Sequence, residues 1–224
     1  MIAAARGGRV ALLAVVLIAA GCAHVEREPR RDGLSFDERR QQLMALPAWQ
    51  MRGRLAVNTG ERAFQGSFSW LQDDMRSTLI VRGPLGGGIL EVTGSPQQMT
   101  VRARGEQRVL EDPEAELSAL LGWWMPVDSL SAWLLGLPDP EHSAATRFGP
   151  NAALEALDQR LWHVEYDAYQ LVDGVVPGPT GGSSGAQADA PGGGVLVPRR
   201  IDMAHDTLEL RLTVDAWEPA SGAP

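Results

Sequence analysis

The sequence has 224 residues with no lysine, one cysteine and four histidines. A single cysteine excludes a disulfide within the chain and a thiol cluster. The histidines lie far apart and do not pair with cysteine or acidic residues at metal-ligand spacing, so we expect no metal and no cofactor. The formal net charge is −8, and arginine supplies every strongly basic side chain. Without a basic patch, a nucleic-acid partner is not expected.

The sequence also has no apolar run that is long enough to span a bilayer. Val10–Ala20 is unbroken, but it is well short of the roughly 20 residues that a transmembrane helix needs. Arg6 and Arg9 precede it, and small residues lead to Gly21 and Cys22. A basic region, a short apolar region and small residues before a cut are the parts of a secretory signal. A cysteine at that cut resembles a bacterial lipobox.

The lipobox predicts that the chain is cleaved before Cys22 and that this residue is acylated. Several acyl chains, at about 0.8 kcal/mol for each buried methylene, hold a protein firmly on a membrane. Ala23 follows the cysteine, whereas aspartate at this position usually retains a lipoprotein in the inner membrane. We therefore expect an outer-membrane location.

Composition divides the chain into five segments. Residues 1–21 are the expected signal peptide, and the polar residues 22–34 read as the lipidated N-terminus and a tether. Residues 35–217 form one domain. Within it, residues 173–194 are dominated by Gly, Pro, Ser and Ala, so we expect a flexible insertion that cannot bury enough apolar surface to order itself. Residues 218–224 are expected to be a loose tail.

Most of the domain alternates between apolar and polar residues. In Trp49–Asn58 the residues Trp49, Met51, Leu55 and Val57 share one face. Similar short segments are Phe64–Trp70, Ser77–Arg82, Ile89–Thr93, Met99–Arg104, Ala153–Leu157, Leu161–Tyr169, Pro198–Met203 and Thr207–Trp217. Alternation with short connections predicts an antiparallel sheet of about ten strands that is covered on one face. A sheet of that size usually curls.

Three helices are predicted beside this sheet. Ser35 and Glu38 have the spacing of a capping box, and Pro47 ends the helix that they begin. Asp112, followed by proline, begins a second helix. Asp128 is the expected N-cap of a third. The last two helices lie in the sequence where they could cover the concave face of the sheet.

Motifs for catalysis are missing. The sequence has no Gly-x-Ser-x-Gly, no Ser-x-x-Lys, and no Lys-Ser/Thr after the glycines of residues 86–88. Most carboxylates fall on outward strand faces, so we do not expect an enzyme. The segment that does not fit a plain surface is residues 82–88, where Leu85 stands between Pro84 and Gly86. This leucine either folds back onto the core or forms an exposed apolar tip.

Taken together, several short motifs resemble the LolB family of outer-membrane lipoprotein receptors of Gram-negative bacteria. The matching segments are residues 49–57, 68–72, 83–86, 125–127, 133–136, 159–162 and 198–201, together with Gly122, Leu130, Val164, Tyr166 and Trp217. Each motif alone is weak, but their order and spacing cover nearly the whole chain after Cys22. Residues 173–194 depart from the family pattern, in which this connection is short.

The resemblance implies a mainly β fold with some α, namely an unclosed antiparallel β-barrel of about ten or eleven strands with a helical lid over a hydrophobic cavity. It implies a monomeric receptor on the periplasmic face of the outer membrane. Such a receptor accepts lipoproteins from the periplasmic carrier LolA, binds their acyl chains and inserts them into outer-membrane lipid. The family's membrane-inserting loop maps onto Leu85 with Pro84 and Gly86.

Inward-facing aromatic and aliphatic side chains are candidates for the cavity wall. They are Trp49, Leu55, Val57, Phe68, Trp70, Leu79, Val81, Trp133 and Trp162. Periodicity does not separate a cavity wall from ordinary core packing. Two other functions also stay open: an assembly lipoprotein that binds a protein partner through a sheet edge, and a lipoprotein hydrolase with a dispersed active site.

Overall fold

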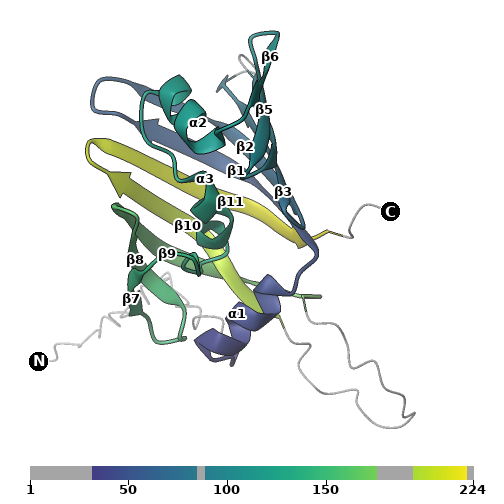
Figure 1. Cartoon of the computed structure of the whole chain (residues 1–224). Helices are drawn as coiled ribbons and strands as arrows, with labels where there is room; N and C mark the ends of the chain where they lie inside the picture. Colours follow the sequence, from purple (N-terminus) through teal and green to yellow (C-terminus); the bar gives the residue numbers. More distant parts are fainter. Residues whose placement is uncertain (1–31, 85–88, 176–193, 221–224) are drawn as a thin grey trace, which may run out of the picture.

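A computed structural model describes residues 32–84, 89–175 and 194–220. In these residues eleven strands form one antiparallel sheet in the order β6-β5-β4-β3-β2-β1-β11-β10-β9-β8-β7 (Figure 1). The first six strands are β1 (Ala48–Asn58), β2 (Ala63–Asp73), β3 (Arg76–Arg82), β4 (Ile89–Ser95), β5 (Gln98–Ala103) and β6 (Glu106–Leu110). The other five are β7 (Ala144–Phe148), β8 (Leu154–Gln159), β9 (Trp162–Val172), β10 (Val195–His205) and β11 (Leu208–Pro219).

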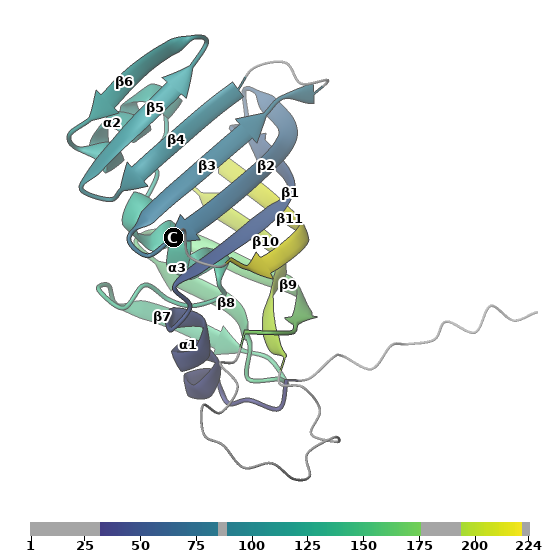
Figure 2. The same ribbon diagram turned by 90° about the vertical axis from the view of Figure 1, so that its right-hand side faces the viewer.

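The sheet is strongly curved and is not closed. β1 pairs with β11, which joins the two halves of the chain at the centre, while β6 and β7 are the two edges. Figures 1 and 2 show the edges on either side of the helices α2 and α3. The predicted fold class, an unclosed antiparallel barrel of ten or eleven strands with helices, is confirmed.

Two strands were not expected from the sequence. β6 has one buried residue, Leu110, and β7 has none. An edge strand that faces solvent on both sides has no reason to alternate, so the period-two signal is missing there. β11 extends to Pro219, so the first two residues of the expected tail belong to this strand. β9 ends at Val172 and β10 begins at Val195, while most of the predicted insertion lies outside the described residues.

The three helices are α1 (Phe36–Met44), α2 (Pro113–Leu121) and α3 (Val127–Leu134). The capping box of α1 is confirmed, since Ser35 and Glu38 bond reciprocally. Asp112 caps α2, and Gly122 ends that helix in the left-handed conformation at φ 83°. The expectation that Asp128 caps α3 is wrong: Pro126 occupies the N-cap position, and Asp128 lies inside the first turn.

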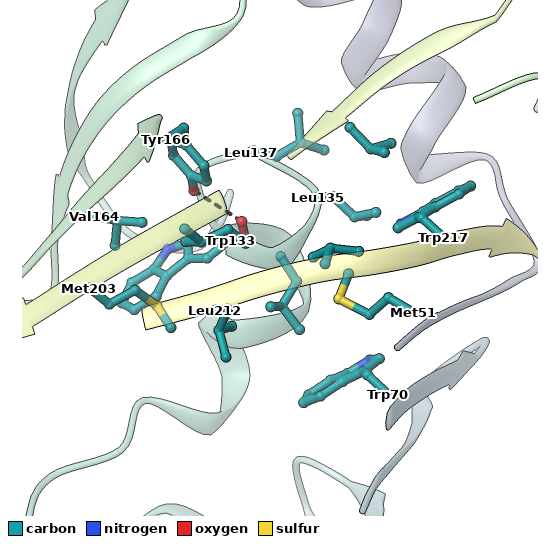
Figure 3. Packing of buried hydrophobic residues seen from close by; sticks show 14 of the residues in the cluster. Met51, Trp70, Trp133, Leu135, Leu137, Val164, Tyr166, Met203, Leu212 and Trp217 are labelled. Carbon is teal, nitrogen blue, oxygen red and sulfur yellow. Dashed lines mark hydrogen bonds between the residues drawn. The ribbon is translucent and has the colours of Figure 1, made fainter. Parts of the chain in front are cut away.

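The buried residues form two separate clusters. The larger lies under α3, where Trp49 stacks on both Trp70 and Trp217 with ring centroids 6.4 and 6.2 Å apart. Figure 3 shows Met51 beside this stack. The smaller cluster is made by β4–β6 together with Leu117 of α2 and the start of α3. Both clusters contain inward-facing residues of the same continuous sheet. The space between the clusters therefore lies on the concave face of the sheet.

Candidate functional site

An apolar cavity of about 220 Å³ lies between the concave face of the sheet and the helices α2 and α3. Its wall consists of Leu55, Val57, Phe64, Phe68, Trp70, Ser77, Leu79, Val81, Leu90, Val92, Met99, Leu117, Leu121, Trp123, Met125, Val127, Leu130, Leu134, Met203, Leu208, Leu210 and Leu212. Ser77 is the one polar residue in this set. The wall draws on both buried clusters, so the cavity is the gap between two packed cores.

The strand alternation explains why this wall is apolar. Leu55 and Val57 point inward from β1, and Leu208, Leu210 and Leu212 do so from β11. Their neighbours in sequence point to the convex face, where they form cross-strand pairs such as Arg54 with Asp215. In the helices, spacings of four residues place Leu117 with Leu121, and Leu130 with Leu134, on one face.

A buried polar network fixes α3 in place behind the wall. The Gln159 side chain accepts from Trp133 Nε1 at 2.7 Å and from the Asp139 backbone N–H at 3.0 Å, and it donates to the Asp139 and His142 carbonyls. Ser129 Oγ donates to Asp139 Oδ2 at 2.6 Å. Tyr166 donates to the Trp133 carbonyl (Figure 3). Because every bond ends on α3 or the segment after it, the network fixes the helix that carries Leu130 and Leu134.

Charged groups lie behind the wall and not on it. Asp128 is on α3, and its pKa is raised by burial and by the nearby carboxylate of Glu114, against the opposing effect of Arg160. Burial also raises the pKa of the Tyr166 hydroxyl. Among the described residues no group of acidic, histidine or cysteine side chains could hold a metal ion. The cavity wall therefore presents an apolar surface to a ligand and carries no charged side chain.

Six of the nine predicted wall residues line the cavity. They are Leu55, Val57, Phe68, Trp70, Leu79 and Val81. The other three do not: Trp49, Trp133 and Trp162 are buried in the larger cluster. Trp49 is sandwiched between two indoles, and Trp133 is tied to Gln159. Trp162 stacks against His205. These three side chains pack in the core. Their periodicity in the sequence is the same as that of residues on the cavity wall, so the sequence pattern could not separate the two.

Several wall residues were missed. Phe64, Leu210 and Leu212 have the inward alternation that selected the others, so the signal was present in the sequence. Trp123 and Met125 follow the end of α2 in a segment without periodicity, so no alternation placed them on the wall. Of the residues in the predicted membrane-inserting loop, Pro84 is exposed and lies just after β3, while Leu85 and Gly86 lie outside the described residues. Cys22, the predicted lipidation site, also lies outside them. In the described part of the chain, no helix is long and apolar enough to cross a membrane.

The sheet is unclosed and antiparallel, it curves around an apolar cavity, and two helices lie over its concave face. These features define the class of protein: a small β-rich protein with a site for apolar ligands. The same fold is seen in the crystal structure of a DUF1329 family protein from Desulfovibrio piger, with a TM-score of 0.50 at 9% identity. That match covers 84% of this chain and 93% of the other.

Sequence comparison identifies the family. The profile described as outer membrane lipoprotein LolB matches residues 47–180, and the chain belongs to this family. The protein named outer-membrane lipoprotein LolB of Stutzerimonas stutzeri is 29% identical over 210 residues, with 92% of both chains covered. That of Nitrosococcus oceani is 30% identical over 216 residues, which covers 93% of this chain and 96% of the relative.

Proposed function

We propose that the protein is an outer-membrane receptor that localises lipoproteins by holding their acyl chains in the apolar cavity. It accepts lipoproteins from the periplasmic carrier LolA and releases them into outer-membrane lipid. The observation that carries this proposal is the cavity wall, which has one polar residue, Ser77, among its side chains. Each buried methylene gains about 0.8 kcal/mol, so an uncharged apolar cavity suits an acyl chain.

The proposed anchor is an acyl group on Cys22 after removal of residues 1–21, which places the monomer on the periplasmic face of the outer membrane. The names of the LolB relatives support an outer-membrane lipoprotein. The apolar loop at Leu85, with Pro84 and Gly86, is the proposed point of contact with lipid. Of the expected tether, residues 22–34, the part before Asp32 then links the lipid to the single domain, because Asp32 is buried against Arg39. Residues 173–194 act as an insertion in the domain.

The two other functions receive less support. A hydrolase needs a nucleophile beside a base, but the wall residues include no histidine or acidic side chain next to the Ser77 hydroxyl. An assembly protein that pairs through a sheet edge needs a long apolar edge strand. The edges β6 and β7 have five residues each and carry Glu106, Arg108 and Arg147. Short, charged edges oppose strand addition.

The proposal is tested by placing a charge inside the cavity and a matched charge outside it. Val57→Glu introduces a carboxylate on the wall, whereas Ala56→Glu introduces one on the opposite face of β1. Each variant and the wild type are offered the acylated and non-acylated forms of one lipoprotein in a pull-down. We expect the wild type and Ala56→Glu to retain only the acylated form and Val57→Glu to lose it by at least tenfold, since an unpaired buried charge is costly.

Circular dichroism and thermal unfolding of both variants show whether they fold. Equal retention of acylated and non-acylated forms by the wild type would refute acyl binding. Retention of the acylated form by a folded Val57→Glu variant would place the acyl site elsewhere. Cleavage of the acyl ester during the incubation, detected by mass spectrometry, would instead favour the hydrolase.

A further inference from the structure

A second pocket adjoins the apolar cavity at one end of the sheet. This mouth pocket lies between the β1–β2 turn, the β10–β11 turn and the end of α2. Figure 1 shows the two turns on the left of the view, and Asn58 and Glu209 beside them are register partners. The residues that line both spaces are Val57, Phe64, Leu121, Trp123 and Leu208. The cavity therefore borders directly on the mouth pocket.

The two spaces differ in polarity. Ser77 is the one polar residue of the cavity wall. The polar and charged residues of the mouth pocket are Thr59, Glu61, Arg62, His205, Asp206 and Thr207. A charged or strongly polar group enters an apolar space only at a large cost. A ligand with one acyl chain and one polar head therefore keeps its head at an end of the cavity, and the mouth pocket offers polar partners for it there.

The single polar wall residue lies at the opposite end of the cavity. Ser77 on β3 has Gln72 of β2 as its register partner. The eight residues from Phe64 to Gln72 correspond to about 26 Å along a strand. On the inward face of β2, Phe64 is 40% exposed at the mouth, whereas Trp70 near the Ser77 end is 6% exposed. Solvent thus reaches the wall at the mouth more than at the far end of β2.

We propose that a ligand lies with its acyl chain in the cavity and its polar head in the mouth pocket, next to the β1–β2 turn. This inference rests on the proposed function and adds to it a head-group site and an orientation. In an acylated lipoprotein, the ester and amide groups around the N-terminal cysteine occupy the mouth pocket, and the peptide leaves the receptor on that side. The opposite orientation has the head beside Ser77.

The β1–β2 turn allows its charges to be changed. The Thr59 N–H donates to the Arg62 carbonyl at 2.9 Å, and the Arg62 N–H donates to Thr59 Oγ1 at 3.2 Å. The Gly60 N–H donates to Asn58 Oδ1 at 3.0 Å. None of these bonds uses the side chain of Glu61 or Arg62, and both residues are exposed. Reversal of either charge should therefore leave the turn intact.

Charge reversal on this turn tests the orientation. Arg62→Glu makes the mouth pocket more negative, and Glu61→Arg makes it more positive. Hexadecanoic acid and hexadecylamine carry opposite charges at mildly alkaline pH, and their affinities for the full chain are measured by displacement of a fluorescent fatty acid. In about 0.1 M salt, a two-charge change about 6 Å from a head alters its affinity roughly threefold. The acid-to-amine affinity ratio should therefore fall roughly tenfold in Arg62→Glu and rise by a similar factor in Glu61→Arg.

Arg76→Glu is the matched control, because Arg76 is exposed and precedes Ser77 at the far end. Screening over about 10 Å at this salt concentration removes its effect on a head in the mouth pocket, so the ratio should equal that of the wild type. Thermal unfolding shows that the variants fold.

A shift in Arg76→Glu as large as those in the turn variants, or larger, would overturn the proposed orientation. An unchanged ratio in all three folded variants would overturn the head-group site while leaving acyl binding intact. A wild type that binds neither amphiphile would refute the proposed function as well.

Discussion

Glu114 and Arg160 meet across the open side of the sheet. Glu114 is on α2 and Arg160 is in the turn between β8 and β9, and their side chains bond at 2.6 and 3.0 Å. Trp124 Nε1 donates to the same carboxylate, and the guanidinium lies 5.1 Å from the centre of the Trp124 ring. Because α2 packs with β4–β6 in the smaller cluster, this ion pair connects that part of the sheet to the turn between β8 and β9.

Loss of the Glu114 charge should loosen the cavity. In Glu114→Gln we expect a stability loss of about 1–2 kcal/mol, since hydrogen bonds to charged groups are worth about 1.5–3 kcal/mol and one oxygen acceptor remains. We also expect several-fold faster release of a bound fluorescent fatty acid, because α2 carries Leu117 and Leu121 of the wall. Urea unfolding and stopped-flow displacement measure the two effects.

Glu116→Gln provides the control on the same helix. Glu116 pairs with the exposed Arg108, and both groups belong to the side of the cavity formed by α2 and β6. The amide oxygen that replaces its carboxylate oxygen can still accept from the Glu111 and Asp112 backbone N–H groups, so Glu116→Gln should change stability little and leave ligand release unaltered. Equal release rates from the Glu114→Gln and Glu116→Gln proteins would show that the ion pair does not restrain the cavity.

Asp32 and Arg39 form a buried ion pair, although Asp32 lies inside the segment 22–34 that we expected to be a tether. Their side chains are 1% and 2% exposed, and the carboxylate also accepts from the Leu196 backbone N–H. Breaking a buried pair typically costs about 3–5 kcal/mol, so Asp32→Asn should lower the free energy of unfolding by that order. Asp37→Asn is the matched control, because Asp37 pairs with Arg40 on the surface and should change stability little.

The same ion pair predicts a dependence on pH. Burial alone would raise the pKa of Asp32, but hydrogen bonds from Arg39, Leu196 and Leu34 outweigh it, and the pKa is lowered from 3.8. A lowered folded-state pKa contributes stability above the unfolded value near 3.8, which is lost as pH falls through the folded value. Urea unfolding between pH 6 and pH 3 should therefore show a larger acid-dependent loss in the wild type than in Asp32→Asn, in which other carboxylates such as Glu38 still titrate. Identical slopes in both proteins would contradict the assignment.

The fold was predictable because most strands are buried on one face. β1 and β11 alternate over most of their length, and Ser35 with Glu38 marked the start of α1. The edge strands β6 and β7 left no pattern, since all of their residues except Leu110 are exposed to solvent. The cavity was harder to predict: Phe68 and Trp49 have the same alternation, yet one lines the cavity and the other stacks between indoles. That difference depends on which side chains fill the interior, and Trp123 has no periodic signal at all.

Gly53 should tolerate no side chain. A Cβ atom there would lie 2.0 Å from the Thr213 carbonyl oxygen on β11, and a backbone atom in a central strand pair cannot move aside. Gly53→Ala is expected to destabilise the protein by about 3 kcal/mol, the upper range for overpacking. In Gly149→Ala the nearest atoms belong to the flexible Glu155 side chain, so the change should be within about 0.5 kcal/mol. Chemical denaturation of both variants checks this, and a wild-type midpoint for Gly53→Ala would refute it.

Leu85 gives the sharpest test of lipid delivery. If its side chain contacts lipid and not the core, Leu85→Ala should cost less than about 0.5 kcal/mol, as surface substitutions usually do, whereas truncation of a core leucine typically costs about 2–5 kcal/mol. Leu85→Glu places a charge at the proposed lipid contact. It should fold, bind acyl chains with wild-type affinity, accept a lipoprotein from the carrier, and fail to release it into liposomes.

The two Leu85 variants are measured for unfolding, acyl binding and transfer in the same preparations. Val57→Glu is the informative comparison, since it should fail at binding, while Leu85→Glu should fail only at release. A large loss of stability in Leu85→Ala would make Leu85 a core residue. Normal delivery to liposomes by Leu85→Glu would show that the loop does not contact lipid during release, even though the cavity still binds the acyl chain. If binding in the cavity and release at the loop are separate steps, as proposed, each of the two substitutions should abolish one step and leave the other intact.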